Sequence, residues 1–258
     1  MKKGILVVSF GTSHEDTRKK TINAITDDVK REFKDFEVRT AFTSSIVMKI
    51  LEQRDKIYVD TVEEALSKMK REKFEEIVVQ PLHVICGEEY NKLVSTVNHF
   101  RHSFSNIKVG NPLLTSIDDY KNVAKALVPE LNESDEENAV VFMGHGTHHH
   151  ANSAYACMDY VLKDMGFSNV HVGTVEGYPE LNDVIGKLSK SETKNVKLLP
   201  LMLVAGDHAK NDMAGEEEDS WENVLKNEGY NVKSFVKGLG EMEEIRKIYM
   251  EHIKDTMN

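Results

Sequence analysis

The sequence predicts an α/β protein of two similar lobes, each a parallel sheet flanked by helices. Short apolar runs alternate with longer amphipathic stretches along all 258 residues. The runs are apolar on both faces, which is typical of strands in a parallel sheet covered on both sides. The order of runs and stretches also repeats. We therefore expect an N-terminal lobe over 1–115 and a C-terminal lobe over 116–258, whose last helix is free to pack across both.

Four strands are expected in the first half. The run "ILVVSF" precedes an amphipathic helix over 13–33, and "EVRTAF" precedes a second helical segment. Asp60 and Glu63 have the spacing of a capping box, which predicts another helix start. The long run "EEIVVQPLHVI" then leads to a helix around 90–97, and "NIKVG" supplies the fourth strand.

The second half repeats this order. "AVVFMG" is followed by a helix that ends near Gly166, and "NVHVGTV" by a helix over 181–188. "NVKLLPLMLVAG" precedes a helix that carries Met213, Trp221, Val224 and Leu225. "YNVKSFV" and a last helix from about Glu241 complete the chain. The joint between the two halves is expected around 112–119.

Three strand-end segments match between the halves. The matched segments are 10–12 with 143–145, 38–44 with 170–176, and 81–89 with 200–208. The first-half residues Thr12, Ser44 and Glu89 are thereby paired with the second-half residues His145, Glu176 and His208. Because ligands of open parallel sheets bind outside the carboxyl ends of the strands, we expect a site at this edge of the second lobe.

The paired second-half residues are two imidazoles and one carboxylate. His145, Glu176 and His208 suit a borderline divalent cation such as Co²⁺, Zn²⁺, Ni²⁺ or Fe²⁺, with coordination positions left open. The same groups accept protons near neutral pH. For each histidine alone, a capping or turn role is the alternative; the joint pattern favours a site.

Other histidines and cysteines are interpreted as structural. The run 148–150 is read as a solvated loop at a helix start, and His83 as a buried, hydrogen-bonded histidine. Cys86 and Cys157 form no C-x-x-C pair and are read as small apolar residues, which suits a reducing compartment, so a cytoplasmic location is expected.

Several classes of function are disfavoured. The net charge of −10 argues against nucleic-acid binding, which depends on clustered Lys and Arg. No apolar run approaches the roughly 20 residues of a membrane span, so no membrane partner is expected. Dinucleotide, Walker and Gly-x-Ser-x-Gly motifs are absent from the sequence.

A family resemblance rests on five segments that span nearly the whole chain. "LVVSFGTS", "QPLHVICGEEY", "VVFMGHGTHHHANSAYACMD", "VGTVEGYP" and "LPLMLVAGDHAKNDMAGEEEDSW" resemble the anaerobic sirohydrochlorin cobaltochelatases of cobalamin biosynthesis, a class II chelatase family. The resemblance implies a ferrochelatase-like fold with a tetrapyrrole cleft between the lobes. It also implies ATP-independent insertion of Co²⁺ into sirohydrochlorin or its reduced precorrin form.

The resemblance assigns roles to individual residues. It implies metal binding by His145, Glu176 and His208. Our mechanistic hypothesis is that the two histidines are also catalytic and that one of them, His145 in preference, accepts a proton. Glu89 is a weaker candidate for proton removal or for facing the substrate. No organic cofactor is implied, and Co²⁺ is the bound substrate metal, although Fe²⁺, Ni²⁺ or Zn²⁺ also fits the ligands. Arg54 and Lys210 are candidates to offset the eight carboxylates of sirohydrochlorin, with a solvated surface role as the alternative.

Three alternatives stay open at this stage. An iron or nickel chelatase could use the same scaffold, because metal selectivity depends on geometry and supply as well as affinity. A tetrapyrrole carrier or metal chaperone would bind without turnover. A metal-dependent hydrolase is disfavoured because no H-E-x-x-H motif occurs. The oligomeric state, homo-oligomers included, is not determined by the sequence.

Overall fold

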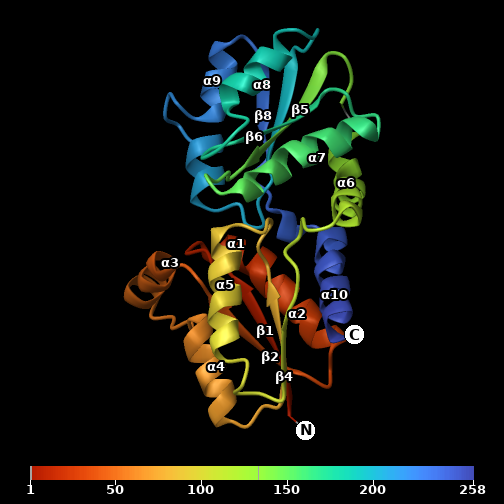
Figure 1. Ribbon diagram of the computed structural model, residues 1–258. Coiled ribbons are helices and arrows are strands. Elements are labelled where there is room, and N and C mark those ends of the chain that lie inside the picture. The colour runs from red at the N-terminus through yellow and green to blue at the C-terminus, as the bar shows by residue number, and fades with distance from the viewer. Residues whose placement is uncertain (1, 133) are drawn as a thin grey trace. The chain divides into compact units, whose positions relative to one another are not determined.

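The chain folds into two compact units. A computed structural model describes residues 2–132 and 134–258. The first unit comprises residues up to Thr115 together with Glu243–Asn258, and the second comprises Ser116–Met242. Each unit has its own sheet and its own helices (Figure 1).

The elements alternate as the sequence predicts, but the single helix expected over 213–225 is a π-helical turn that ends at Met213 and a separate short helix that begins at Trp221. The first unit contains β1 (Lys3–Ser9), α1 (Glu15–Arg18), η1 (Lys19–Asn23), α2 (Ala24–Glu32), β2 (Glu37–Phe42), α3 (Ser45–Ile50), η2 (Leu51–Asp55), α4 (Val62–Arg71), β3 (Glu76–Pro81), α5 (Glu88–His99), β4 (Asn106–Val109) and α10 (Glu243–Met257). The second contains α6 (Ile117–Leu131), β5 (Asn138–Gly144), η3 (His150–Asn152), α7 (Ser153–Asp164), β6 (Val170–Thr174), α8 (Leu181–Leu188), β7 (Asn195–Pro200), η4 (Ala209–Met213), α9 (Trp221–Asn227), β8 (Asn231–Ser234) and η5 (Leu239–Glu241).

Both sheets have four parallel strands in the same topological order. The first runs β2-β1-β3-β4 and the second β6-β5-β7-β8. Their registers also correspond, since Val8 lies opposite Pro81 in one sheet and Met143 lies opposite Pro200 in the other. The predicted pair of parallel α/β lobes is confirmed.

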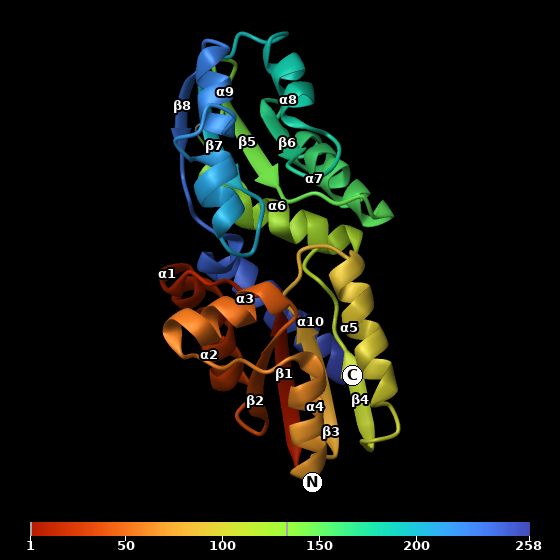
Figure 2. The same cartoon turned by 90° about the vertical axis from the view of Figure 1, so that its left-hand side faces the viewer.

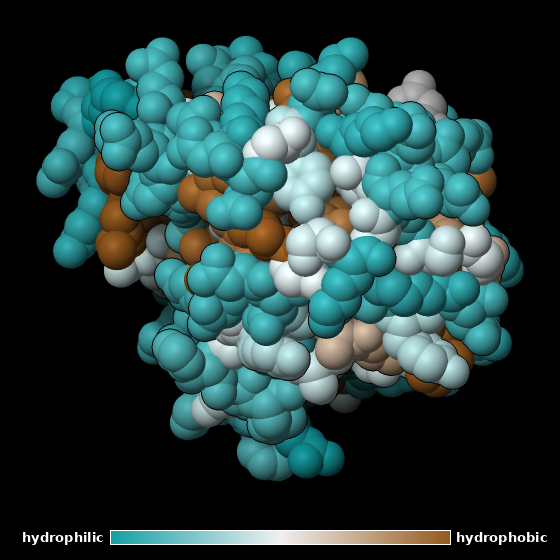
Figure 3. Space-filling model, turned by 90° about the horizontal axis from the view of Figure 1, so that it is seen from above, coloured by the Kyte–Doolittle hydropathy of each residue, from teal (hydrophilic) through white to brown (hydrophobic). Residues whose placement is uncertain are grey.

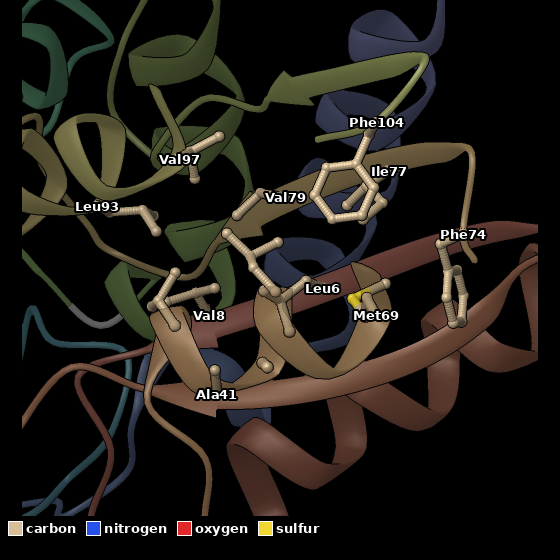
Figure 4. Close-up of a cluster of buried hydrophobic side chains, with 13 residues drawn as sticks. Leu6, Val8, Ala41, Met69, Phe74, Ile77, Val79, Leu93, Val97 and Phe104 are labelled. Atoms are coloured by element: carbon tan, nitrogen blue, oxygen red, sulfur yellow. The ribbon is translucent and has the colours of Figure 1, made fainter. Parts of the chain in front are cut away.

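Helices cover both faces of each sheet. In the first unit, α4 and α5 lie on one face and α2 and α10 on the other (Figure 2). One core cluster gathers apolar side chains of β1, β3, α4 and α5, among them Leu6, Val8, Leu66, Val79 and Leu93 (Figure 4). These five side chains are at most 1% exposed, and burial of each stabilises the fold by roughly 1.5–3 kcal/mol.

The last helix departs from the predicted division of the chain. Residues 243–258 were expected in the C-terminal lobe with freedom to pack across both, but α10 belongs to the first unit. Its Tyr249 is fully buried and donates a hydrogen bond to the carbonyl of Leu82, 3.1 Å away. Arg246 also pairs with Asp28 of α2 at 2.6 Å. Tertiary packing therefore determines where this helix lies, and the helical periodicity of the sequence does not predict it.

Three local predictions, one helix start and two strand ends, are corrected by one to six residues. The capping box of α4 is formed by Thr61 and Glu64 instead of Asp60 and Glu63. The predicted strands over 75–85 and 195–206 end early, at Pro81 and Pro200. Proline has no N–H to continue a ladder, so each apolar run goes on as a loop, which is mostly buried over 201–205 and partly buried over 82–85.

Two further features complete the fold. No helix in the described part of the chain is long and apolar enough to cross a membrane. Figure 3 shows one face of the molecule, on which hydrophilic residues predominate and hydrophobic ones form small patches. This surface agrees with a chain in which 29% of the residues are charged.

Candidate metal centre

Backbone hydrogen bonds at the carboxyl ends of the strands fix which residues correspond between the two units. Ser44 N–H donates to the carbonyl of Phe10 at 3.2 Å, and Glu176 N–H donates to the carbonyl of His145 at 2.8 Å. Phe10 is therefore the counterpart of His145, and the predicted pairing of Thr12 with His145 is wrong by two residues. The pairing of Ser44 with Glu176 agrees with the register.

The error arose from the two glycines in "GHG". The sequence match paired Gly11 with Gly144, but the hydrogen-bond register pairs Gly11 with Gly146. Both of these have positive φ, +100° and +82°, a conformation that glycine adopts without strain. The turns after β1 and β5 thus have similar backbone conformations. They differ in chemistry because the position of His145 in the second unit is occupied by Phe10 in the first.

His145 follows β5 directly and is held by its own loop. Its Nδ1 lies 2.9 Å from the carbonyl oxygen of Gly146. Because a carbonyl can only accept, Nδ1 carries the proton and Nε2 is left with its lone pair available for a metal. Beneath the loop, the Tyr155 hydroxyl interacts with the backbone amides of His145 and Gly146, while burial raises the pKa of Tyr155.

Glu176 lies two residues beyond β6, in a loop tied to that of His145. Asn152, at the end of η3, links the two loops. Its Oδ1 accepts from Thr147 N–H at 3.0 Å, and its amide donates to the carbonyl of Tyr178. The backbone bond between Glu176 and His145 adds a second tie. The two loops are therefore positioned by backbone contacts, which leaves both side chains available.

His208 is delivered by a buried loop instead of by a strand end. After Pro200, the side chains of 201–205 are mostly buried, and the Leu239 and Gly240 N–H groups donate to the carbonyls of this loop. His208 then begins the π-helical turn η4, whose Ala209 and Met213 are fully buried. The turn is thereby fixed to the core, and His208 lies on its outer side.

The three predicted residues come together in the second unit. One ligand atom from each of His145, Glu176 and His208 lies within 4.8 Å of the others. His145 Nδ1 is 3.8 Å from Glu176 Oε2, and the two imidazole rings are 4.5 Å apart between centroids, at 82°. The side chains of His145, Glu176 and His208 are 46%, 54% and 36% exposed. The cluster is thus open to an incoming metal ion and to a bulky second reactant.

The donor set of this cluster defines its chemistry. Two imidazole nitrogens and one carboxylate oxygen suit Co²⁺, Fe²⁺, Ni²⁺ and Zn²⁺. Three protein ligands leave coordination positions free for water or substrate. Within residues 2–132 and 134–258, these three residues form the group of three or more His, Cys, Asp or Glu side chains whose ligand atoms lie close enough together to hold one metal ion.

Glu89 occupies the matching edge of the first unit, where it is the counterpart of His208. It begins α5 as the second residue after the N-cap Gly87 and pairs with Lys92 at 2.8 Å. Burial acts to raise the pKa of Glu89, but hydrogen bonds from Lys92 and Thr43 outweigh it and hold this pKa below its usual range. Glu89 is therefore a carboxylate at neutral pH.

The histidines interpreted as structural are accounted for differently. His149 accepts from Ala151 N–H at the start of η3 and stacks on His150, as a loop role predicts. His83 was expected to be hydrogen-bonded, but its buried ring nitrogens have no partner in the described structure. Its segment is a loop beyond β3 that is held by the backbone, since Leu113 N–H donates to the carbonyl of His83 at 2.9 Å. Burial lowers the pKa of His83 to about 4, so the ring is neutral.

Sequence reasoning missed three residues that shape the site. Asp212 accepts from Nδ1 of His208 at 2.5 Å, while Asn152 and Tyr155 hold the loops. Asn152 lies two residues beyond the histidine run 148–150, which is interpreted as a solvated loop. Arg54, a predicted substrate contact, belongs to the first unit and pairs with Asp55 at 2.7 Å.

Solved structures share this fold. SirB from Bacillus subtilis, determined with Fe³⁺, matches with a TM-score of 0.67 at 18% identity, over 99% of this chain and 96% of that one. CbiX, described as the terminal enzyme of siroheme biosynthesis in denitrifying bacteria, matches with a TM-score of 0.61 at 14% identity, over 99% and 100%. The chain therefore has a chelatase-like fold of two α/β units.

Closer relatives are found by sequence. Residues 3–258 match the family model of the cobalt chelatase CbiK. The chain is 41% identical to the sirohydrochlorin cobaltochelatase of Salmonella typhimurium, over 100% of this chain and 97% of that protein. It is 36% identical to the sirohydrochlorin cobaltochelatase CbiKC of Nitratidesulfovibrio vulgaris, over 98% and 89%. The chain belongs to the cobalt chelatase family CbiK, which confirms the resemblance seen in its motifs.

Proposed function

We propose that the protein inserts Co²⁺ into sirohydrochlorin, or into its reduced precorrin form, without ATP and without an organic cofactor. The observation that carries the proposal is the convergence of His145, Glu176 and His208 at one sheet edge. Two relatives that match over nearly their whole length are named sirohydrochlorin cobaltochelatases. Co²⁺ and the tetrapyrrole are the substrates in this proposal.

The mechanism is an exchange of one metal ion for two protons. His145, Glu176 and His208 hold Co²⁺ with open coordination positions, to which the pyrrole nitrogens of the macrocycle bind. As the ion passes to the macrocycle, its ligands are released with free lone pairs. Nε2 of His145 then accepts one of the two pyrrole protons, because its Nδ1 already carries a proton donated to Gly146. A second base must accept the other proton.

His208 and Glu89 are the candidates for that second base. His208 also regains its Nε2 lone pair when the ion leaves. Glu89 is ionised because its hydrogen bonds hold its pKa low, which makes it a weak proton acceptor at neutral pH. We therefore assign proton removal first to the two histidines and propose an assisting role for Glu89.

The direct test is an anaerobic insertion assay that follows sirohydrochlorin absorbance after Co²⁺ is added. We expect His145→Ala, Glu176→Gln and His208→Ala each to lower the insertion rate by more than the roughly 10–100-fold that is typical when a hydrogen-bond partner of a metal ligand is removed. His150→Ala is the matched control, because His150 is a nearby histidine that begins η3 and lies outside the cluster. Wild-type rates for all three cluster variants would refute the assigned site.

The same assay separates the alternatives. Faster insertion of Fe²⁺ or Ni²⁺ than of Co²⁺ would identify an iron or nickel chelatase, and Zn²⁺ is expected to bind the same ligands. Stoichiometric binding of metal and tetrapyrrole without turnover would identify a carrier. We further propose a cytoplasmic location, since the free thiols of Cys86 and Cys157 suit a reducing compartment.

A further inference from the structure

Comparison of the two units isolates one extra residue beside the metal cluster. After the corresponding glycines, the first unit reads Gly-Glu-Glu-Tyr-Asn-Lys-Leu from Gly87 and the second reads Gly-Asp-His-Ala-Lys-Asn-Asp-Met from Gly206. Both segments begin alike, because the residue four positions on donates to each glycine carbonyl, at 3.0 Å in both units. The second segment then has one additional residue before its next buried apolar side chain.

The extra residue is accommodated by the π-helical turn. In the first unit, α5 is a regular helix whose Leu93 is buried, six residues beyond Gly87. In the second unit, the buried side chain is Met213, seven residues beyond Gly206, and η4 is the π turn. A π turn is one residue wider than an α turn and is frequently found at functional sites. The widening leaves Asp212 on the outer side of the turn.

Asp212 is therefore beside His208, four residues away. Its Oδ2 lies 2.5 Å from Nδ1 of His208. In the first unit, the corresponding Glu89 pairs instead with Lys92, three residues away. The hydrogen bond between Asp212 and His208 thus depends on the inserted residue, and both ends are held because Ala209 and Met213 are fully buried.

We propose that Asp212 is a positioning residue for His208, which directs Nε2 of this imidazole toward the metal. A carboxylate accepts a hydrogen bond from Nδ1–H, which keeps the proton on Nδ1 and the lone pair on Nε2. A histidine ligand whose other ring nitrogen donates to a carboxylate or a carbonyl has a fixed tautomer and ring orientation. His145 obtains this from the Gly146 carbonyl and His208 from Asp212. The inference rests on the proposed metal-binding role of His208.

The test uses two variants and a matched control. Asp212→Ala removes the acceptor, and Asp212→Asn keeps its size while its amide group can donate to Nδ1 and favour the other tautomer. Glu218→Gln makes the same charge change on an exposed side chain of the same segment. Calorimetric titration with Co²⁺ should show about 10–100-fold weaker binding for both Asp212 variants. The control should bind as the wild type does, and all proteins should keep the wild-type melting temperature.

A spectroscopic measurement separates positioning from a general structural effect. Nitrogen-15 NMR of the metal-free protein reports which ring nitrogen of His208 is protonated. We expect the Nδ1–H form in the wild type and a shift toward Nε2–H in Asp212→Asn. An unchanged tautomer, or Co²⁺ binding by Asp212→Ala equal to that of the wild type, would overturn the inference. Absence of Co²⁺ binding by the wild type would instead refute the proposed site, and the tautomer measurement would still decide the role of Asp212.

Discussion

Replacement of Gly146 by alanine should disturb both stability and the metal cluster. Gly146 has φ +82°, a conformation that costs a residue with a Cβ about 1–2 kcal/mol. A Cβ at this position would lie 2.7 Å from the backbone nitrogen of Gly177 and 2.9 Å from the carbonyl carbon of Glu176. Such overpacking against the backbone typically costs a further 1–3 kcal/mol or so. The expected total is about 2–5 kcal/mol.

Gly166→Ala provides the matched control. Gly166 also has positive φ, +99°, but a Cβ there would meet no atom within 4 Å. Its replacement should therefore cost only the backbone strain, about 1–2 kcal/mol. The difference between the two variants isolates the contact with the Glu176 loop, which urea denaturation followed by circular dichroism can measure.

The same substitution should weaken metal binding. Movement of the Glu176 loop away from Gly146 would separate the Glu176 carboxylate from His145, whose atoms now lie 3.8 Å apart. Calorimetric titration should show weaker Co²⁺ binding for Gly146→Ala and unchanged binding for Gly166→Ala. Equal stability of the two variants, with equal Co²⁺ affinity, would refute the assigned role of this close contact.

Three further predictions concern stability, measured by denaturant unfolding. Gly186→Ala in α8 should stabilise the protein by about 0.5–1 kcal/mol, because a Cβ there meets no atom within 4 Å and glycine is a poor helix former; a loss would show that hidden crowding exists. Tyr249→Phe should cost about 1 kcal/mol through the lost bond to Leu82, and no cost would mean that the bond is immaterial. Burial lowers the pKa of His171 to about 4. Since the unfolded chain titrates near 6.5, it binds more protons than the folded chain between these values, so stability falls as the pH falls through this window. From pH 7 to about pH 5 this histidine alone should account for a loss of about 2 kcal/mol, which His171→Gln should abolish. An unchanged pH dependence in that variant would contradict the assignment.

The sequence was sufficient to predict the two parallel α/β units and the three clustered residues. Apolar runs and strand-end polar residues directly reflect burial and sheet topology, and both are visible in the letters. The residue-by-residue alignment of the two halves could not be predicted from the sequence, because "GHG" contains two glycines, Gly144 and Gly146, and either can be aligned with Gly11. Only the hydrogen bond from Glu176 to His145 shows that Phe10 is the true counterpart.

Other features depend on tertiary contacts that leave no local pattern. The amphipathic stripe of α10 indicates that one side is buried but not which sheet covers it, and Tyr249 shows that the first unit does. Asp212 was missed for another reason: its contact with His208 is local, four residues along the chain, but the burial of Ala209 and Met213 places it on the outer side of η4. When the sequences of the two units are aligned at Gly87 and Gly206, the extra residue before Met213 is visible and indicates that the second helix start is widened.

The most direct test of the metal centre is a crystal soaked with Co²⁺ and measured at the cobalt absorption edge. We predict one strong anomalous peak within coordination distance of Nε2 of His145, Nε2 of His208 and the Glu176 carboxylate. Ligation through the two Nε2 atoms would also agree with Nδ1 hydrogen bonds to Gly146 and Asp212. A principal peak elsewhere, for example at the histidine run 148–150, with none at this cluster, would contradict the proposed site.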